Sequence, residues 1–357
     1  MITFYPGPSK VYPEVPDYVR DAYDAGVLSI NHRSPEFMEI FQRTTQLVKE
    51  KLHIPEDYTV VFSSSATECW EIICQSLVEK KSFHMYNGAF GAKWLRYAQI
   101  LVPTTESLAF ETESIPEVNS IQVGDSELIA LTHNETSNGT ALPSDWMQEL
   151  RARFPEILIA VDATSSMAGV DLSWEAADVW FASVQKCFGL PAGLAAMVLS
   201  PKAIERVQKI GNRGYYNSLL NIYEQNQHHQ TTHTPNVLGI YLLMRVMEDR
   251  EPISIISAEI KARYSEWKKM LFNLNYVKHI IHNSQVQSKT VITFQAEKEV
   301  INQIRQQARA HGIVLGNGYG KLKETTLRIA NFPAITENDI HQLKEFFANF
   351  APENSMR

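Results

Sequence analysis

Short apolar segments alternate with amphipathic ones through the middle of the chain, and this alternation is the strongest constraint on its fold. Several of the short segments are apolar throughout, as strands buried on both faces of a sheet are. The segments between them, such as 66–80 and 144–154, have helical spacing. This order predicts an α/β fold whose mostly parallel sheet is covered by helices on both faces. The predicted strands are 58–64, 127–133, 157–163, 179–184 and 195–200.

The pattern changes beyond about residue 250, where a long helical stretch leads into shorter, alternating strands. We therefore expect a large domain over 1–250, with its N-terminal segment close to the functional site, and a smaller α+β domain over 251–357. The chain is long enough to bury two cores of these sizes. The predicted elements of the second domain are a helix at 253–274, strands at 290–296 and 326–332, and a last helix at 336–350.

The composition indicates which partners the protein can bind and in which compartment it is expected to lie. The formal net charge is −7 and no basic stripe occurs, which argues against a nucleic-acid partner. No apolar stretch approaches the about 18–20 residues that a membrane span needs, and the opening MITFYPGPSK has no secretory signal. The cysteines are few and odd in number: Cys69, Cys74 and Cys187. We expect a cytoplasmic protein without disulfides or a membrane partner.

Two ionisable residues follow buried strands. Asp162 ends an apolar segment in AVDATSS, where ligands commonly meet a parallel sheet, although an aspartate there equally often caps the next turn. Lys186 follows the strand at 179–184 and lies between Val184 and Phe188. Desolvation lowers the pKa of a lysine and favours its neutral, nucleophilic form. Taken alone, a surface lysine at a strand end is the more common case.

Together the two residues indicate a more specific chemistry. Enzymes that use pyridoxal 5′-phosphate (PLP) need a lysine for its aldehyde and an acid for its pyridine nitrogen. One strand and its connections separate Asp162 from Lys186, so both emerge at the same edge of the sheet. A helix starts after Ser65-Ala66-Thr67, and a helix N-terminus can bind the phosphate, although an ordinary cap has the same sequence.

With these residues in place, the whole chain resembles the class V, fold-type I aminotransferases, in the group of the phosphoserine and alanine/serine–glyoxylate aminotransferases. Each matching segment is weak alone, but their order and spacing are specific. The segments are FYPGPSKV, NHRSPEF (31–37), SSSATE (63–68), NGAFGAKW (87–94), THNETSNGT (132–140), VDATSS (161–166), SVQKCFG (183–189), THTPNV (232–237) and LRIANFP (327–333).

The resemblance implies a role for each matching residue. Lys186 is the Schiff-base lysine that moves the substrate proton, and Asp162 pairs with the pyridine nitrogen. Arg328, in an alternating strand, grips the substrate α-carboxylate with paired hydrogen bonds, although an arginine there could also lie on a solvated strand face. The other implied cofactor contacts are a ring stacked by Phe90, hydrogen bonds from Thr136 and Gln185, phosphate contacts from Ala66 and Thr67, and Thr164 beside Asp162.

The resemblance also implies a homodimer with shared sites. His233 and Thr234 match positions that reach the phosphate from the neighbouring subunit. His32 and Arg33 match a pair that binds the distal phosphate of phosphoserine, yet the glyoxylate group has HRSPEF here too. A second His-Arg pair usually precedes the arginine strand in the phosphoserine enzymes. This chain has none there, and only Lys321 and Lys323 could substitute.

The predicted function is transamination of phosphoserine with 2-oxoglutarate, and the alternative is alanine or serine with glyoxylate or pyruvate. A cysteine desulfurase is disfavoured because Gln185 precedes the lysine and no cysteine follows Cys187. A non-catalytic PLP-fold binding protein is disfavoured because Asp162, Lys186 and Arg328 occur together. We expect no metal at His228, His229 and His233, and we interpret GNGYGK (316–321) as a turn.

Overall fold

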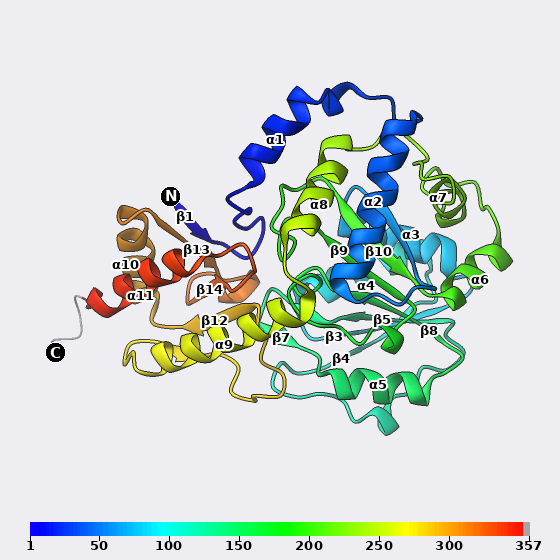
Figure 1. Ribbon diagram of the computed structural model, residues 1–357. Helices are drawn as coiled ribbons and strands as arrows, with labels where there is room; N and C mark the ends of the chain where they lie inside the picture. The colour runs from blue at the N-terminus through cyan, green and yellow to red at the C-terminus, as the bar shows by residue number, and fades with distance from the viewer. Residues whose placement is uncertain (353–357) are drawn as a thin grey trace.

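A computed structural model describes residues 1–352 of the chain, and its largest element is a seven-stranded sheet (Figure 1). The strand order is β2-β10-β9-β8-β5-β3-β4. Only β10 runs antiparallel to its neighbours β2 and β9. The predicted α/β fold with a mostly parallel sheet is therefore confirmed. The strands are β2 (Thr59–Ser63), β3 (Ser82–Tyr86), β4 (Glu106–Ala109), β5 (Leu128–Thr132), β8 (Leu158–Asp162), β9 (Val179–Ser183) and β10 (Ala195–Leu199).

The apolar strands bury both of their faces. In β8, Leu158 and Ala160 join one hydrophobic cluster, whereas Ile159 and Val161 join the other. Successive side chains of a strand point to opposite faces, so a continuous apolar run fits only a sheet that is covered twice. One cluster includes α3 (Ala66–Leu77), α4 (Ala89–Leu101), α6 (Pro201–Ile210) and α7 (Leu219–Asn226); the other includes α1 (Val15–Asp24), α2 (Pro35–Leu52), α5 (Ser144–Arg153) and α8 (Val237–Asp249).

A second sheet has the order β1-β13-β14-β12-β11. Its first strand, β1 (Ile2–Phe4), comes from the N-terminus and pairs in parallel with β13, so the N-terminal segment joins the sheet formed by the last third of the chain (Figure 1). The domain boundary near residue 250 stays a prediction. The remaining elements here are α9 (Ile253–Phe272), β11 (Lys278–His279), β12 (Val291–Gln295), α10 (Lys298–Ala310), β13 (Ile313–Asn317), β14 (Thr326–Ala330) and α11 (Glu337–Asn349).

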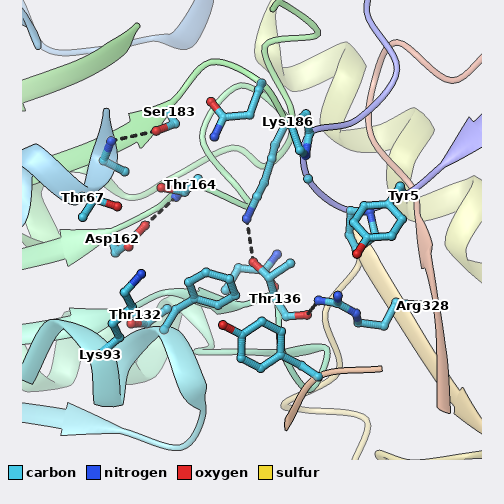
Figure 2. Close-up of a pocket in the computed structure, with 18 of the residues that line it drawn as sticks. Tyr5, Thr67, Lys93, Thr132, Thr136, Asp162, Thr164, Ser183, Lys186 and Arg328 are labelled. Atoms are coloured by element: carbon cyan, nitrogen blue, oxygen red, sulfur yellow. Dashed lines mark hydrogen bonds between the residues drawn. The ribbon is translucent and has the colours of Figure 1, made fainter. Parts of the chain in front are cut away.

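The topology brings several strand ends to one edge of the large sheet. Because β2, β5, β8 and β9 are mutually parallel, their carboxyl ends lie on the same side. Asp162 ends β8 and Ser183 ends β9, and Figure 2 shows them beside each other with Lys186 following. Ligands of open α/β sheets bind at this edge. A small hairpin, β6 (Asn134–Glu135) and β7 (Thr140–Ala141), follows β5 at the same edge.

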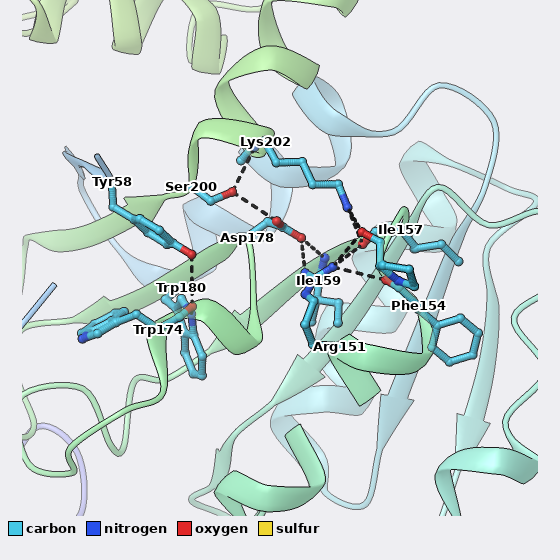
Figure 3. A network of polar contacts seen from close by, with 12 residues as sticks. Tyr58, Arg151, Phe154, Ile157, Ile159, Trp174, Asp178, Trp180, Ser200 and Lys202 are labelled. Carbon is cyan, nitrogen blue, oxygen red and sulfur yellow. Dashed lines mark hydrogen bonds and ion pairs between the residues drawn. The ribbon is translucent and has the colours of Figure 1, made fainter. Parts of the chain in front are cut away.

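The opposite edge of the sheet is held by a polar network around Asp178 (Figure 3). The Asp178 carboxylate accepts the Ile159 N–H at 2.8 Å and the Ser200 hydroxyl at 3.1 Å, and it forms an ion pair with Arg151. Arg151 also donates to the carbonyl of Ile157 at 3.0 Å. One buried carboxylate therefore joins α5 to β8, β9 and the start of α6.

We expect Asp178→Ala to lower the free energy of unfolding by roughly 3 kcal/mol, because it leaves a half-buried guanidinium and a buried amide without their acceptor. Urea unfolding, followed by circular dichroism, measures the loss. The matched control is Asp171→Ala at an exposed position, which should change stability by less than about 0.5 kcal/mol. A loss in Asp178→Ala that equals the control would contradict this role.

Candidate active site

A cavity of about 500 Å³ lies where the strand ends meet the second sheet (Figure 2). Its size suits a cofactor together with a small substrate. Its walls combine strand ends of the large sheet, the start of α3 and α4, the N-terminal segment and the β13–β14 connection. The predicted residues that line it are Ala66, Thr67, Phe90, Thr136, Asp162, Thr164, Gln185, Lys186 and Arg328.

Lys186 is buried at the centre of the cavity, with 6% of its surface exposed. Its Nζ donates to the Thr136 hydroxyl and to the Ser165 hydroxyl, each at 2.8 Å. Burial lowers the pKa of Lys186 to about 8, against the opposing charge of Asp162. Gly7 packs on the lysine stem, where a Cβ would lie 2.9 Å from Cε. The N-terminal segment therefore closes the cavity behind the amine.

Asp162 is held in place by two hydrogen bonds. Its Oδ2 accepts the Trp70 indole N–H at 3.1 Å, and its Oδ1 accepts the backbone N–H of Thr164 at 3.0 Å. Burial raises the pKa of Asp162, and the bonds from Thr164 and Trp70 and the charge of Lys186 oppose that shift. The buried hydroxyls of Thr164 and Thr132 have no hydrogen-bond partner among the described residues 1–352, and both residues line the cavity.

The start of α3 forms an anion-binding end of the cavity. Ser65 caps the helix by accepting the Glu68 N–H at 3.1 Å, and the Ala66 N–H donates to the Ser183 hydroxyl at 2.7 Å. The Thr67 N–H has no acceptor among residues 1–352, and Thr67 lines the cavity. A free N–H at a helix N-terminus favours a negatively charged group.

Arg328 approaches the cavity from the second sheet. It lies in β14 with 5% of its surface exposed, so the solvated strand face is excluded for this side chain. Its Nη1 donates to the Thr136 carbonyl at 2.8 Å, and its Nε donates to the Asn317 carbonyl at 2.6 Å. Nη2 forms no hydrogen bond within the described part of the chain and remains available for a carboxylate.

Two aromatic rings form one wall. The Phe90 ring centroid lies 5.3 Å from Lys186 Nζ and 5.4 Å from the Tyr319 ring centroid. Tyr319 belongs to the segment that we interpreted as a turn. This segment leaves β13 and enters a short 3₁₀ turn at Gly320–Leu322, and it lines the cavity.

Four predicted site residues do not line this cavity. His32, Arg33, His233 and Thr234 lie together elsewhere, with His32 Nδ1 and the Thr234 hydroxyl 3.5 Å apart. Arg33 donates to Gln225 at 3.1 Å. Burial and the charges of Arg33 and His233 lower the pKa of His32. The two pairs therefore form one basic group on the outside of α2 and α7.

The sequence interpretation missed several residues of the site. Trp70 lies one helical turn after Ala66, so its spacing along α3 could have indicated that both face the cavity. Ser165 and Glu135 stand in quoted motifs, but nothing in their own type indicated a role. Thr164 donates its backbone N–H to Asp162. The side chain of Lys321 lies outside the described residues.

Lys186 and Asp162, buried together at the carboxyl edge of a parallel sheet, are the amine and the acid that the class of PLP-dependent enzymes needs. The sequence matches the profile of the family described as Aminotransferase class-V over residues 3–343. The chain belongs to this family, and it is a PLP-dependent aminotransferase.

Relatives with known names cover nearly the whole chain. The phosphoserine aminotransferase of Rhodococcus opacus is 30% identical over 94% of this chain and 91% of its own length. That of Corynebacterium glutamicum is 31% identical over the same shares. A crystal structure of a phosphoserine aminotransferase from Cytophaga hutchinsonii superposes with a TM-score of 0.93 at 33% identity, over 97% of this chain and 98% of that one.

An alanine–glyoxylate aminotransferase from Nostoc sp. superposes with a TM-score of 0.84 at 19% identity, over 97% of this chain and 94% of that chain, which shows the shared fold. No helix within residues 1–352 is long and apolar enough to cross a membrane. No group of three or more potential metal-ligand side chains occurs among these residues either.

The residues present fit PLP. The cavity offers a buried amine of lowered pKa, a buried carboxylate, two unpartnered hydroxyls and a free helix N–H. These groups are the counterparts of an aldehyde, a pyridine nitrogen, a ring hydroxyl and a phosphate.

We expect the rate at which the apoenzyme takes up PLP to level off above pH about 8, because Lys186 has a pKa of about 8 and reacts only as the neutral amine. A free lysine analogue, with an ordinary pKa near 10.5, is the reference. Dividing the rate constant of the apoenzyme by that of the analogue cancels the titration of PLP itself. Measured by stopped-flow absorbance, this ratio should be constant below pH about 8 and fall above it. A constant ratio up to pH about 10 would contradict the lowered pKa.

Proposed function

We propose that this enzyme transfers the amino group of phosphoserine to 2-oxoglutarate, with PLP attached to Lys186. The observation that carries the proposal is the cavity itself. It brings together Lys186, whose pKa is lowered, the buried carboxylate of Asp162, and Arg328, one of whose guanidinium nitrogens is available for a ligand. The named relatives at about 30% identity support phosphoserine as the donor.

Bound PLP draws electrons from the substrate α-carbon, so that a proton can leave it. Asp162 would keep the pyridine nitrogen protonated, and the Trp70 N–H and Thr164 N–H hold its carboxylate in place. Lys186 Nζ, as a neutral amine, would take the proton from the α-carbon of the substrate. Arg328 orients the substrate through its α-carboxylate, and Thr67 with the start of α3 holds the cofactor phosphate.

Two further lysines support a donor with a distal anionic group. Lys93 and Lys323 line the same cavity and are exposed, and neither forms an ion pair with another residue of the described range 1–352. An ammonium group binds phosphate as a point charge, with less directionality than the missing His-Arg pair. Lys323 is thus our candidate for the distal phosphate within one subunit.

The basic group of His32, Arg33, His233 and Thr234 lies outside the cavity of its own chain, which supports a homodimer in which it completes the partner's site. A monomer mass in analytical ultracentrifugation of the active enzyme would exclude this assembly. We also propose that the enzyme is cytoplasmic.

A panel of amino donors tests the substrate. We expect phosphoserine to change the absorption band of the bound cofactor faster than alanine or serine does, and 2-oxoglutarate to restore the band faster than glyoxylate or pyruvate does. Lys186→Ala is the control, since it should abolish turnover while the circular dichroism of the folded protein persists. No response to phosphoserine with a fast response to alanine or serine would establish the alternative, an alanine/serine–glyoxylate aminotransferase.

We expect Arg328→Ala to raise the KM of the donor by roughly 30- to 1000-fold, which corresponds to the loss of about 2–4 kcal/mol from a charge-assisted contact. Arg328→Lys should fall between the wild type and Arg328→Ala, because it keeps the charge and loses the planar fork. Steady-state kinetics with the best donor measures both, and Arg309→Ala at an exposed position of α10 is the matched control. An unchanged KM in Arg328→Ala would remove Arg328 from the substrate site.

A further inference from the structure

The carboxylate of Glu135 is buried directly behind the aromatic wall of the cavity, with 1% of the residue exposed. Its Oε2 accepts the backbone N–H groups of Phe90 and Gly91, each at 3.1 Å. Its Oε1 accepts the N–H of Ser137 at 3.0 Å and the Ser137 hydroxyl at 2.6 Å. All four contacts donate to the carboxylate, so it is fully used as an acceptor.

Helix α4 depends on this carboxylate for its first turn. The residue before the helix, Gly88, has no side chain that could cap it, and a Cβ there would lie 2.2 Å from Glu135 Cγ. The third free N–H, that of Ala89, donates at 3.0 Å to the Ser137 hydroxyl that Glu135 holds. The negative charge also lies at the positive end of the helix dipole. Glu135 and Ser137 together therefore satisfy the three amides that open α4.

Phe90 is the residue in this turn that faces the reactive amine, with its ring centroid 5.3 Å from Lys186 Nζ. Glu135 and Thr136 are consecutive residues of the hairpin, and they contact different parts of the site. Thr136 contacts Lys186 and Arg328, whereas Glu135 contacts the start of α4. A displacement of the carboxylate would thus move the ring relative to the lysine.

We propose that Glu135 is a positioning residue, which fixes the first turn of α4 by accepting two of its amides and by holding Ser137, and which thereby holds the Phe90 ring against the cofactor. The inference rests on the proposed placement of the cofactor ring between Phe90 and Lys186. The burial of Glu135 raises its pKa against the bonds from Ser137 and Gly91. The hydrogen-bonding pattern, which has only donors facing the group, fits a carboxylate and not an amide.

The test uses Glu135→Gln in the PLP-loaded enzyme. Glutamine keeps the shape but turns one oxygen into an NH₂ group. In either orientation this NH₂ faces a backbone N–H that it cannot accept, those of Phe90 and Gly91 or that of Ser137. We expect faster hydrogen exchange of the amides at 89–91, an altered visible circular dichroism of the bound cofactor and a kcat about 10- to 100-fold lower, with a smaller change in KM. Glu149→Gln, exposed on α5, is the matched control and should change none of these readouts.

A double-mutant cycle decides whether the effect passes through Phe90. If Glu135 acts by holding the ring, Glu135→Gln and Phe90→Leu together should lower kcat little more than Phe90→Leu alone. Multiplicative effects would overturn the proposal, as would a lower Tm for Glu135→Gln with an unchanged cofactor spectrum and kcat.

Ser137→Ala gives a milder perturbation should Glu135→Gln not fold. It removes the acceptor of the Ala89 N–H and one donor to Glu135. It should shift the cofactor spectrum in the same direction, and an unchanged spectrum would overturn the proposal. The spectral and exchange readouts need only bound PLP and no particular donor. Failure of the phosphoserine proposal therefore leaves this test intact.

Discussion

The burial of the Lys186 amine is the constraint on which the rest of the site depends. A charged lysine buried in the protein is unfavourable, and here desolvation lowers the pKa of Lys186 to about 8. The surrounding groups bind the amine without strongly stabilising its protonated form. The two nearest acceptors are the hydroxyls of Thr136 and Ser165, and the closest acid, Asp162, is engaged by Trp70 and Thr164. This arrangement keeps Lys186 available as a nucleophile near neutral pH.

The fold supplies this environment because strand ends of the seven-stranded sheet lie close to an arginine of the five-stranded sheet. Asp162 ends β8 and Lys186 follows shortly after the adjacent parallel strand β9, so the sheet brings both to the same edge. Arg328 comes from β14, and the short hairpin after β5 connects it to Lys186 through the two polar groups of Thr136. The geometry between amine and guanidinium therefore depends on how this hairpin sits between the two sheets. That dependence explains why so many hairpin side chains are buried and hydrogen-bonded.

Much of the fold and the centre of the site could be predicted because they follow from local periodicity. The apolar strands, and Asp162 and Lys186 after them, need only the order of the chain and the rule for parallel sheets. Contacts between distant segments could not be predicted this way. Trp70 meets Asp162 from 92 positions away, and Glu135 meets Phe90 across 45. The pairing of β1 with β13 has the same origin, since no local pattern in three residues indicates a partner at the other end of the chain.

The charge balance of the cavity gives a physical reason for an anionic substrate. Lys186 and Arg328 are buried, Lys93 and Lys323 stand at the wall, and Asp162 is the acid that lines the same space. Glu135 adds a second negative charge behind the wall, but its four donors occupy it. The positive excess is therefore left for the ligands. In the proposed complex, the phosphate of the cofactor would neutralise part of it at α3, and an α-carboxylate at Arg328 would neutralise more. Lys323 remains as an exposed, solvated ammonium, so the distal phosphate of the donor that we propose would gain a favourable charge contact there that alanine lacks.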